Sequence, residues 1–168
     1  MKRIVWIVVA AVVLTWGMAG TGYAEPVRVG TVTPLTGKLA VYGEGFQNAM
    51  YLALEEVNAE GGINGRPMEI VFEDNTSTSK GSVSAIQKLI TVNKLPVIFG
   101  PAASSNFLAV CPIAQQNETV LIGAESAAED ISTCGSFVFR VFPSDTLQGE
   151  GVAELARGLG YEEVVLTY

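Results

Sequence analysis

The fold is decided by a stretch that begins with Val27-Arg-Val-Gly-Thr-Val-Thr33 and ends with Met68-Glu-Ile-Val-Phe-Glu-Asp74. In both runs an apolar or β-branched side chain recurs at every second position, which is typical of a β-strand. Residues 43–60 between them carry apolar side chains at helical spacing and end at Gly61-Gly62, residues that accept the positive φ of a helix C-terminus. A strand, a helix and a second strand in this order predict a βαβ unit, whose strands run parallel.

The same alternation continues along the chain. A helix is predicted at Ser79–Asn93, and Pro96 ends that pattern before the next apolar strand. Ser104 or Ser105 is expected to be the N-cap of a helix that runs to about Gln116. The whole pattern predicts an α/β domain, a parallel sheet flanked by helices on both faces. The remaining predicted elements are strands at residues 97–100, 119–123, 137–142 and 163–168, and a helix at residues 146–159.

The first 24 residues are organised like a cleaved secretory signal. Residues 1–3 give a basic start, residues 4–14 form an uncharged apolar run, and the small residues Gly22 and Ala24 precede a break. A membrane span needs about 18 or more apolar residues, and this run is shorter; an uncleaved N-terminal anchor is the alternative. We expect residues 1–24 to be removed on export, which leaves Glu25 as the first residue.

Charge and composition exclude several classes of function. Lys2 and Arg3 are two of the ten basic residues, so eight remain after residue 24 against 17 acidic ones, a net charge of −9. Such a balance argues against a nucleic acid partner, because phosphate backbones are neutralised by Lys and Arg. The sequence contains no His, which excludes Ser-His-Asp and Cys-His catalysis and His-ligated zinc. We therefore expect no catalytic residues, no metal and no cofactor.

The sequence has two cysteines, Cys111 and Cys134. In an exported protein an even pair is expected to form a disulfide. Two unpaired thiols are the alternative.

Polar loops follow three of the predicted strands. They contain Tyr42 after the first strand, Ser104 and Ser105 after the third, and Ser126 after the fourth. The carboxyl ends of parallel strands meet at one edge of a sheet, so these loops are expected to converge there. A helix N-terminus with free N–H groups and a Ser hydroxyl binds a carboxylate without a positive side chain; plain N-capping by the serines is equally compatible with the sequence.

The sequence segments that resemble catalytic motifs lack residues that those motifs require. Residues 30–38 resemble a phosphate-binding loop, but Val32 stands where its first glycine should be and Leu39 where Ser or Thr should bind magnesium. A small exported α/β hydrolase using Glu73 and Asp74 remains an alternative. Adjacent residues of a strand point to opposite faces, however, so these two carboxylates cannot readily share a substrate.

An ordered series of motifs resembles the leucine-binding-protein family, the periplasmic solute receptors of branched-chain amino-acid ABC transporters. The series covers nearly the whole chain from about residue 27, and its most specific block is Gly61-Gly62-Ile63-Asn64-Gly65. Its other members are Thr33-Pro34-Leu35-Thr36-Gly37, Tyr42-Gly43, Glu56-Val57-Asn58-Ala59, Glu73-Asp74, Ile98-Phe99-Gly100-Pro101, Phe139-Arg140 and Pro143-Ser144-Asp145.

The resemblance implies a type I periplasmic-binding-protein fold, with two α/β lobes that close on an amino acid or a related small carboxylate. Residues 25–143 would form the N-terminal lobe, still incomplete, and residues 144–168 the hinge crossing and the first helix and strand of the second lobe. It also implies location in the periplasm and permease subunits of an ABC transporter as partners. A ligand-sensing domain of the same fold is the alternative.

The resemblance also assigns roles to single residues. Ser104 matches the serine that holds the ligand carboxylate, Tyr42 an aromatic side chain lining the first lobe, and Glu125 a position that contacts the ligand through its backbone. Ala127 departs from the family, which usually places Ser or Thr there to meet the ligand ammonium group. The predicted ligand-binding set is Tyr42, Ala102, Ala103, Ser104, Ser105, Glu125, Ser126 and Ala127.

Overall fold

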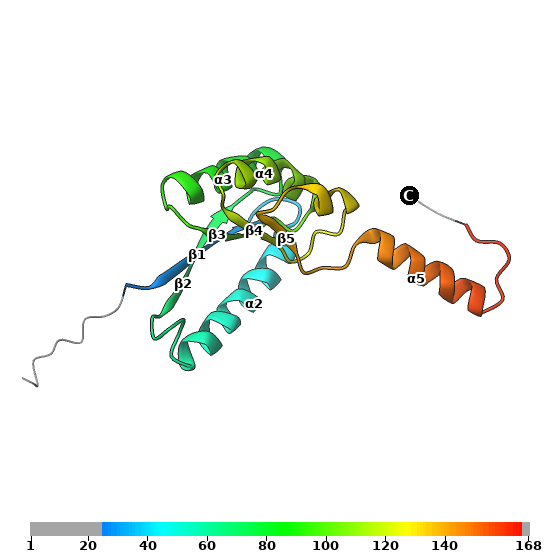
Figure 1. The fold of residues 1–168 in the computed structure, drawn as a ribbon, viewed down its shortest axis with the longest axis horizontal. Helices are drawn as coiled ribbons and strands as arrows, with labels where there is room; N and C mark the ends of the chain where they lie inside the picture. The colour runs from blue at the N-terminus through cyan, green and yellow to red at the C-terminus, as the bar shows by residue number, and fades with distance from the viewer. Residues whose placement is uncertain (1–24, 166–168) are drawn as a thin grey trace, which may run out of the picture.

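The computed structural model describes residues 25–165, and the signal sequence predicted at residues 1–24 lies outside this range. Its centre is a parallel five-stranded sheet in the order β2-β1-β3-β4-β5 (Figure 1). The predicted α/β fold with a parallel sheet is therefore confirmed. The strands are β1 (Val27–Thr33), β2 (Met68–Asp74), β3 (Val97–Phe99), β4 (Val120–Gly123) and β5 (Val138–Arg140).

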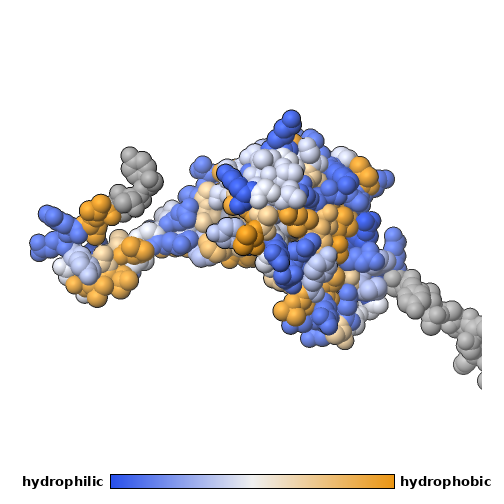
Figure 2. All heavy atoms as spheres, turned by 180° about the vertical axis from the view of Figure 1, so that it is seen from behind, coloured by the Kyte–Doolittle hydropathy of each residue, from blue (hydrophilic) through white to orange (hydrophobic). Residues whose placement is uncertain are grey.

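Helices cover the two faces of the sheet unequally. Helices α3 (Ser79–Thr91) and α4 (Ser104–Gln116) pack against each other over one face, and α2 (Ala40–Ala59) crosses the other (Figure 1). Helix α2 packs mainly on β1 and β2, so this face remains more open over β3, β4 and β5. Phe139 of β5, for example, is 52% exposed. Figure 2 shows apolar surface both on the body that contains the sheet and on the part of the chain that stands apart from it.

Two neighbouring residues of β2 contact helices on opposite faces of the sheet. The Glu73 carboxylate forms an ion pair with Lys88 of α3, with 2.7 Å between Oε1 and Nζ. The ring of Phe72 points the other way and packs on Tyr51 of α2, with 5.1 Å between ring centroids. Each side of the sheet therefore has its own set of packing partners, as the period of a strand requires.

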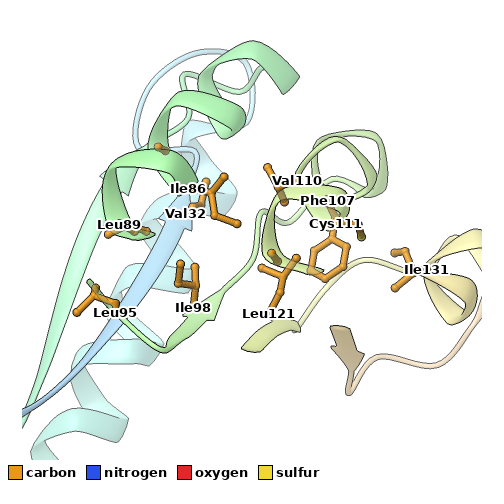
Figure 3. Close-up of a cluster of buried hydrophobic side chains, with 12 residues drawn as sticks. Val32, Ile86, Leu89, Leu95, Ile98, Phe107, Val110, Cys111, Leu121 and Ile131 are labelled. Carbon is orange, nitrogen blue, oxygen red and sulfur yellow. The ribbon is translucent and has the colours of Figure 1, made fainter. Parts of the chain in front are cut away.

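The main core lies between the sheet and the α3–α4 layer (Figure 3). Side chains from three central strands meet side chains from both helices there, and burial of this apolar surface stabilises the domain. The largest fully buried apolar side chains of this cluster are Val32, Ile86, Leu89, Ile98, Phe107, Val110 and Leu121.

Two of the predicted helix starts differ in the structure. Helix α2 begins at Ala40 rather than Gly43, because the Leu39 N–H donates to Ser77 Oγ at 3.0 Å and fixes the preceding loop. Helix α4 has Ala103 as its N-cap, with no side-chain cap, so the prediction of Ser104 or Ser105 as N-cap is wrong. Both serines lie inside the first turn instead.

Two turns depend on glycine. Gly61 and Gly62 follow α2 with φ of 99° and 74°, which confirms the predicted helix end. Gly43 lies in the first turn of α2, where a Cβ would come 2.1 Å from the Pro34 carbonyl oxygen. Only glycine lets the helix backbone pass so close to the end of β1.

The last part of the described chain stands away from the sheet (Figure 1). Helix α5 (Asp145–Gly158) begins where Ser144 Oγ accepts the Leu147 N–H at 3.3 Å, and it contains no buried residue. Residues 161–165 are not in a strand, so the strand predicted at 163–168 is absent from its described part. Among the described residues, no strand pairs with residues 161–165 to satisfy their backbone groups. The assignment of residues 144–168 to a second lobe stays a prediction.

Two further features concern single helices. A short 3-10 helix, η1 (Glu129–Thr133), follows β4 and was not predicted. Among residues 25–165, no helix combines the length and the apolar character needed to cross a membrane.

Candidate ligand-binding edge

The loops after β1, β3 and β4 meet at the carboxyl edge of the sheet, as predicted. They surround a small hollow of about 10 Å³, room for roughly one water molecule. The hollow is therefore too small to enclose an amino acid. The hollow is lined by Val32, Thr33, Pro34, Tyr42, Phe46, Gly100, Ala102, Ala124 and Glu125.

The start of α4 offers hydrogen-bond donors beside this hollow. Ser104 Oγ accepts the N–H groups of Ala127 and Ala128 at 3.2 and 3.3 Å. Since both of these contacts use the oxygen as acceptor, the hydroxyl proton is left to donate. The N–H groups of Ser104 and Ser105 have no acceptor in the described part of the chain. Such an uncapped helix start favours an anionic group.

Ser126 has a different role from Ser104. Its side chain has no exposed surface, and its hydroxyl donates to the carbonyl oxygens of Pro101 and Ala102, each at 3.0 Å. This hydroxyl joins the loop after β4 to the loop after β3. Ser126 therefore holds the two loops of the site together and is not itself accessible to a ligand.

Arg140 of β5 holds the loop after β4 from the other side. Its Nη1 donates to the carbonyl oxygens of Ala127 and Ala128 at 3.0 and 2.7 Å, and its Nη2 donates to Ser132 Oγ at 2.9 Å. The sequence reasoning missed this role. The available signal was a lone charged residue inside an otherwise apolar strand.

Phe107 fixes the position of α4 on the sheet. Its ring is fully buried and lies where Cβ atoms on Gly100 and Gly123 would stand, 2.4 and 2.9 Å from Cε2. The glycines at the ends of β3 and β4 therefore let the aromatic ring sit directly on the backbone. This packing places the start of α4 at the edge where the loops converge.

Tyr42 and Glu125 complete the rim of the hollow. Tyr42 extends from the first turn of α2 and is 67% exposed. Partial burial raises the pKa of the Glu125 carboxyl above its ordinary value. No Lys or Arg of the described range forms an ion pair with it.

The structure thus separates the predicted site residues into groups. Tyr42, Ala102 and Glu125 line the hollow, and Ser104, Ser126 and Ala127 form the hydrogen-bond network beside it. Ala103 and Ser105 line a neighbouring hollow instead.

Cys111 and Cys134 lie side by side but are not bonded to each other. Cys111 is buried in α4, and Cys134 follows η1. Burial, reinforced by the Cys134 thiol, raises the pKa of Cys111 far above the ordinary range of a thiol. The disulfide stays a prediction.

Comparison with known proteins agrees with this geometry. The model of the family described as "Periplasmic binding protein" matches residues 26–168. The chain belongs to the periplasmic binding protein family. The resemblance seen in the sequence and the type I periplasmic-binding-protein fold are both confirmed.

Several curated periplasmic binding proteins are related to the chain. The Leu/Ile/Val-binding protein BraC3 of Rhizobium johnstonii is 27% identical over 146 residues, which cover 86% of this chain and 39% of that protein. The leucine-, isoleucine-, valine-, threonine- and alanine-binding protein of Pseudomonas aeruginosa is 26% identical and covers 75% and 34% of the two chains.

Solved structures of the family show the same arrangement. The branched-chain amino acid transporter substrate-binding protein LivJ of Streptococcus pneumoniae, in complex with isoleucine, superposes with a TM-score of 0.74 at 28% identity, covering 79% of this chain and 38% of that one. The leucine-binding protein LivK of Thermotoga maritima gives a TM-score of 0.72 at 28% identity, covering 80% and 38%. The chain spans less than two fifths of the length of each of these four relatives.

Proposed function

We propose that this chain is the ligand-binding first lobe of an extracytoplasmic solute receptor that serves an ABC importer of branched-chain or related amino acids, or of other small carboxylates. The observation that supports this most is the free start of α4. Ser104 keeps a hydroxyl proton to donate, and the first two N–H groups of the helix have no acceptor among residues 25–165. The carboxylate of a ligand would meet this helix start, and the aliphatic part of the same ligand would lie against Tyr42 and the apolar residues of the hollow.

Glu125 is the acidic residue that lines the hollow at Tyr42. Ala127 offers no hydroxyl to a ligand ammonium group, and its N–H is bonded to Ser104. The partly buried carboxylate of Glu125 would be the group of this lobe that attracts an ammonium. Its attraction is strongest in the ionised form, above the raised pKa of Glu125.

One lobe supports only weak binding. A charge-assisted hydrogen bond contributes about 1.5–3 kcal/mol, whereas a micromolar complex needs about 8 kcal/mol. The hollow at this edge is too small to enclose a ligand, so a bound ligand would stay exposed to water and few further contacts would add to the total. The missing affinity would come from a second lobe that closes over the ligand.

The test is an NMR titration of the 168-residue chain with leucine, isoleucine and valine. We expect millimolar affinity, with the backbone amide signals of residues 104–106 and of Ala127 shifting. Ser104→Ala should abolish these shifts, whereas Ser84→Ala, at an exposed serine of α3, should leave them unchanged. Micromolar affinity would contradict the account of closure. If none of the amino acids shifts these amides, the proposed site is wrong.

Export is tested separately. The intact mass of the protein recovered outside the cytoplasm should begin at Glu25. A product that retains Met1 would contradict the predicted cleavage after Ala24.

A further inference from the structure

A second hollow lies at the starts of α3 and α4, with a volume of about 440 Å³. It shares no lining residue with the hollow at Tyr42 and Glu125. Its only ionisable lining residue is Lys38, in the loop before α2. The complete lining is Lys38, Leu39, Ser77, Thr78, Ser79, Ala103, Ser105 and Asn106.

The starts of α3 and α4 both line this hollow. Neither α3 nor α4 has an acidic residue in its first turn. The N–H groups of Ser79 and Lys80, like those of Ser104 and Ser105, have no acceptor within residues 25–165. The positive ends of two helix dipoles therefore meet at one place without a carboxylate to balance them.

Asn106 adds an independent observation. Its side chain is only 4% exposed, yet it lines the hollow. Asn106 Oδ1 accepts the Ser79 hydroxyl at 2.9 Å, which fixes the amide orientation. Asn106 Nδ2 has no acceptor in the described part of the chain and is not sealed from solvent. Asn106 thus brings to the hollow an amide NH2 group with no protein acceptor among residues 25–165, which leaves it available to an anion.

We propose that this second hollow binds a tetrahedral oxyanion, either free phosphate or sulfate or the phosphate group of a monoester. Its donors are the Lys38 ammonium, the Asn106 amide, the Ser105 hydroxyl and the N–H groups of Ser79 and Lys80 at the start of α3. They approach from three segments of the chain and suit an anion whose oxygens point in several directions. A carboxylate has only two oxygens and would leave part of this donor set unpaired.

The experiment is a titration of the 168-residue chain with inorganic phosphate at constant ionic strength, with chloride as the balancing anion. Two-dimensional NMR should show saturable shifts of the amides at the start of α3 and of the Asn106 side-chain NH2 signals. Sulfate and phenyl phosphate form two further arms. Binding of inorganic phosphate but not of phenyl phosphate assigns the free ion, and binding of both assigns a site open to monoesters.

Two variants separate binding from folding. Lys38→Gln should weaken phosphate binding about tenfold, since it removes a charge-assisted hydrogen bond. Lys80→Gln is the matched control, because it removes the same charge from α3 at a residue outside the hollow. Ser105→Asp places a carboxylate at the start of α4, which should stabilise the helix and abolish phosphate binding.

Three results would overturn the proposal. The first is a wild-type chain with no saturable response to phosphate or sulfate. The second is an equal effect of Lys38→Gln and Lys80→Gln. The third is binding of acetate or leucine in competition with phosphate, which would make this hollow part of the amino-acid site.

Discussion

Replacing Ser126 by alanine tests the network that joins the two ligand-binding loops. The Ser126 hydroxyl is fully buried, and its single proton is shared between the carbonyl oxygens of Pro101 and Ala102. Alanine fills nearly the same space, so the substitution removes the hydrogen bond and creates little cavity. The buried Pro101 carbonyl oxygen then remains without this donor.

The expected cost follows from these contacts. A neutral hydrogen bond contributes about 1 kcal/mol net, and a buried carbonyl without its partner adds a desolvation penalty, so the loss should be about 2 kcal/mol. For a chain of this size the Tm should fall by about 7 °C. Urea denaturation followed by circular dichroism should show a lower midpoint with an unchanged slope.

The matched control is Ser84→Ala, at an exposed serine of α3. It should change the free energy of unfolding by no more than about 0.5 kcal/mol. A loss below about 0.5 kcal/mol for Ser126→Ala as well would refute the reasoning, because the hydroxyl would then not be holding the two loops together.

Three further predictions concern other parts of the fold. Mild oxidation should join Cys111 to Cys134 and stabilise the domain by about 3 kcal/mol; two thiols that still react with Ellman's reagent after oxidation would contradict this. Phe107→Ala should lower the free energy of unfolding by about 3–5 kcal/mol in a urea titration, because loss of a fully buried ring leaves a cavity. A loss below about 1.5 kcal/mol would show that the ring does not anchor α4. Asp74→Asn should cost about 1 kcal/mol at neutral pH. Burial works to raise the pKa of Asp74, but hydrogen bonds from Thr36, Thr76 and Leu35 outweigh it and lower this pKa. The ionised carboxylate therefore stabilises the fold above about pH 4. The difference in the free energy of unfolding between wild type and Asp74→Asn should shrink as the pH falls through the depressed pKa. A difference that does not depend on pH would contradict the role of the charge.

Local sequence patterns were sufficient for the strand–helix order and for the edge at which the site lies. Strands β1 and β2 have the predicted bounds, because their side chains alternate between the two faces of the sheet and this alternation can be read from the sequence. The resemblance to the family was also visible in the sequence, and Gly61, Gly62 and Asn64 of its most specific motif stand at turns with positive φ.

Only the tertiary structure decided what each polar side chain at the edge does. Ser104 and Ser126 look alike in sequence, yet one keeps a proton for a ligand while the other is buried between two loops. The start of α2 likewise depends on Ser77, which is 38 residues from Leu39. Sequence periodicity reports which face of an element is apolar, because that depends on neighbours along the chain. The partner of a hydroxyl is set by which loops the sheet brings together, and this contact exists only once the strands have paired.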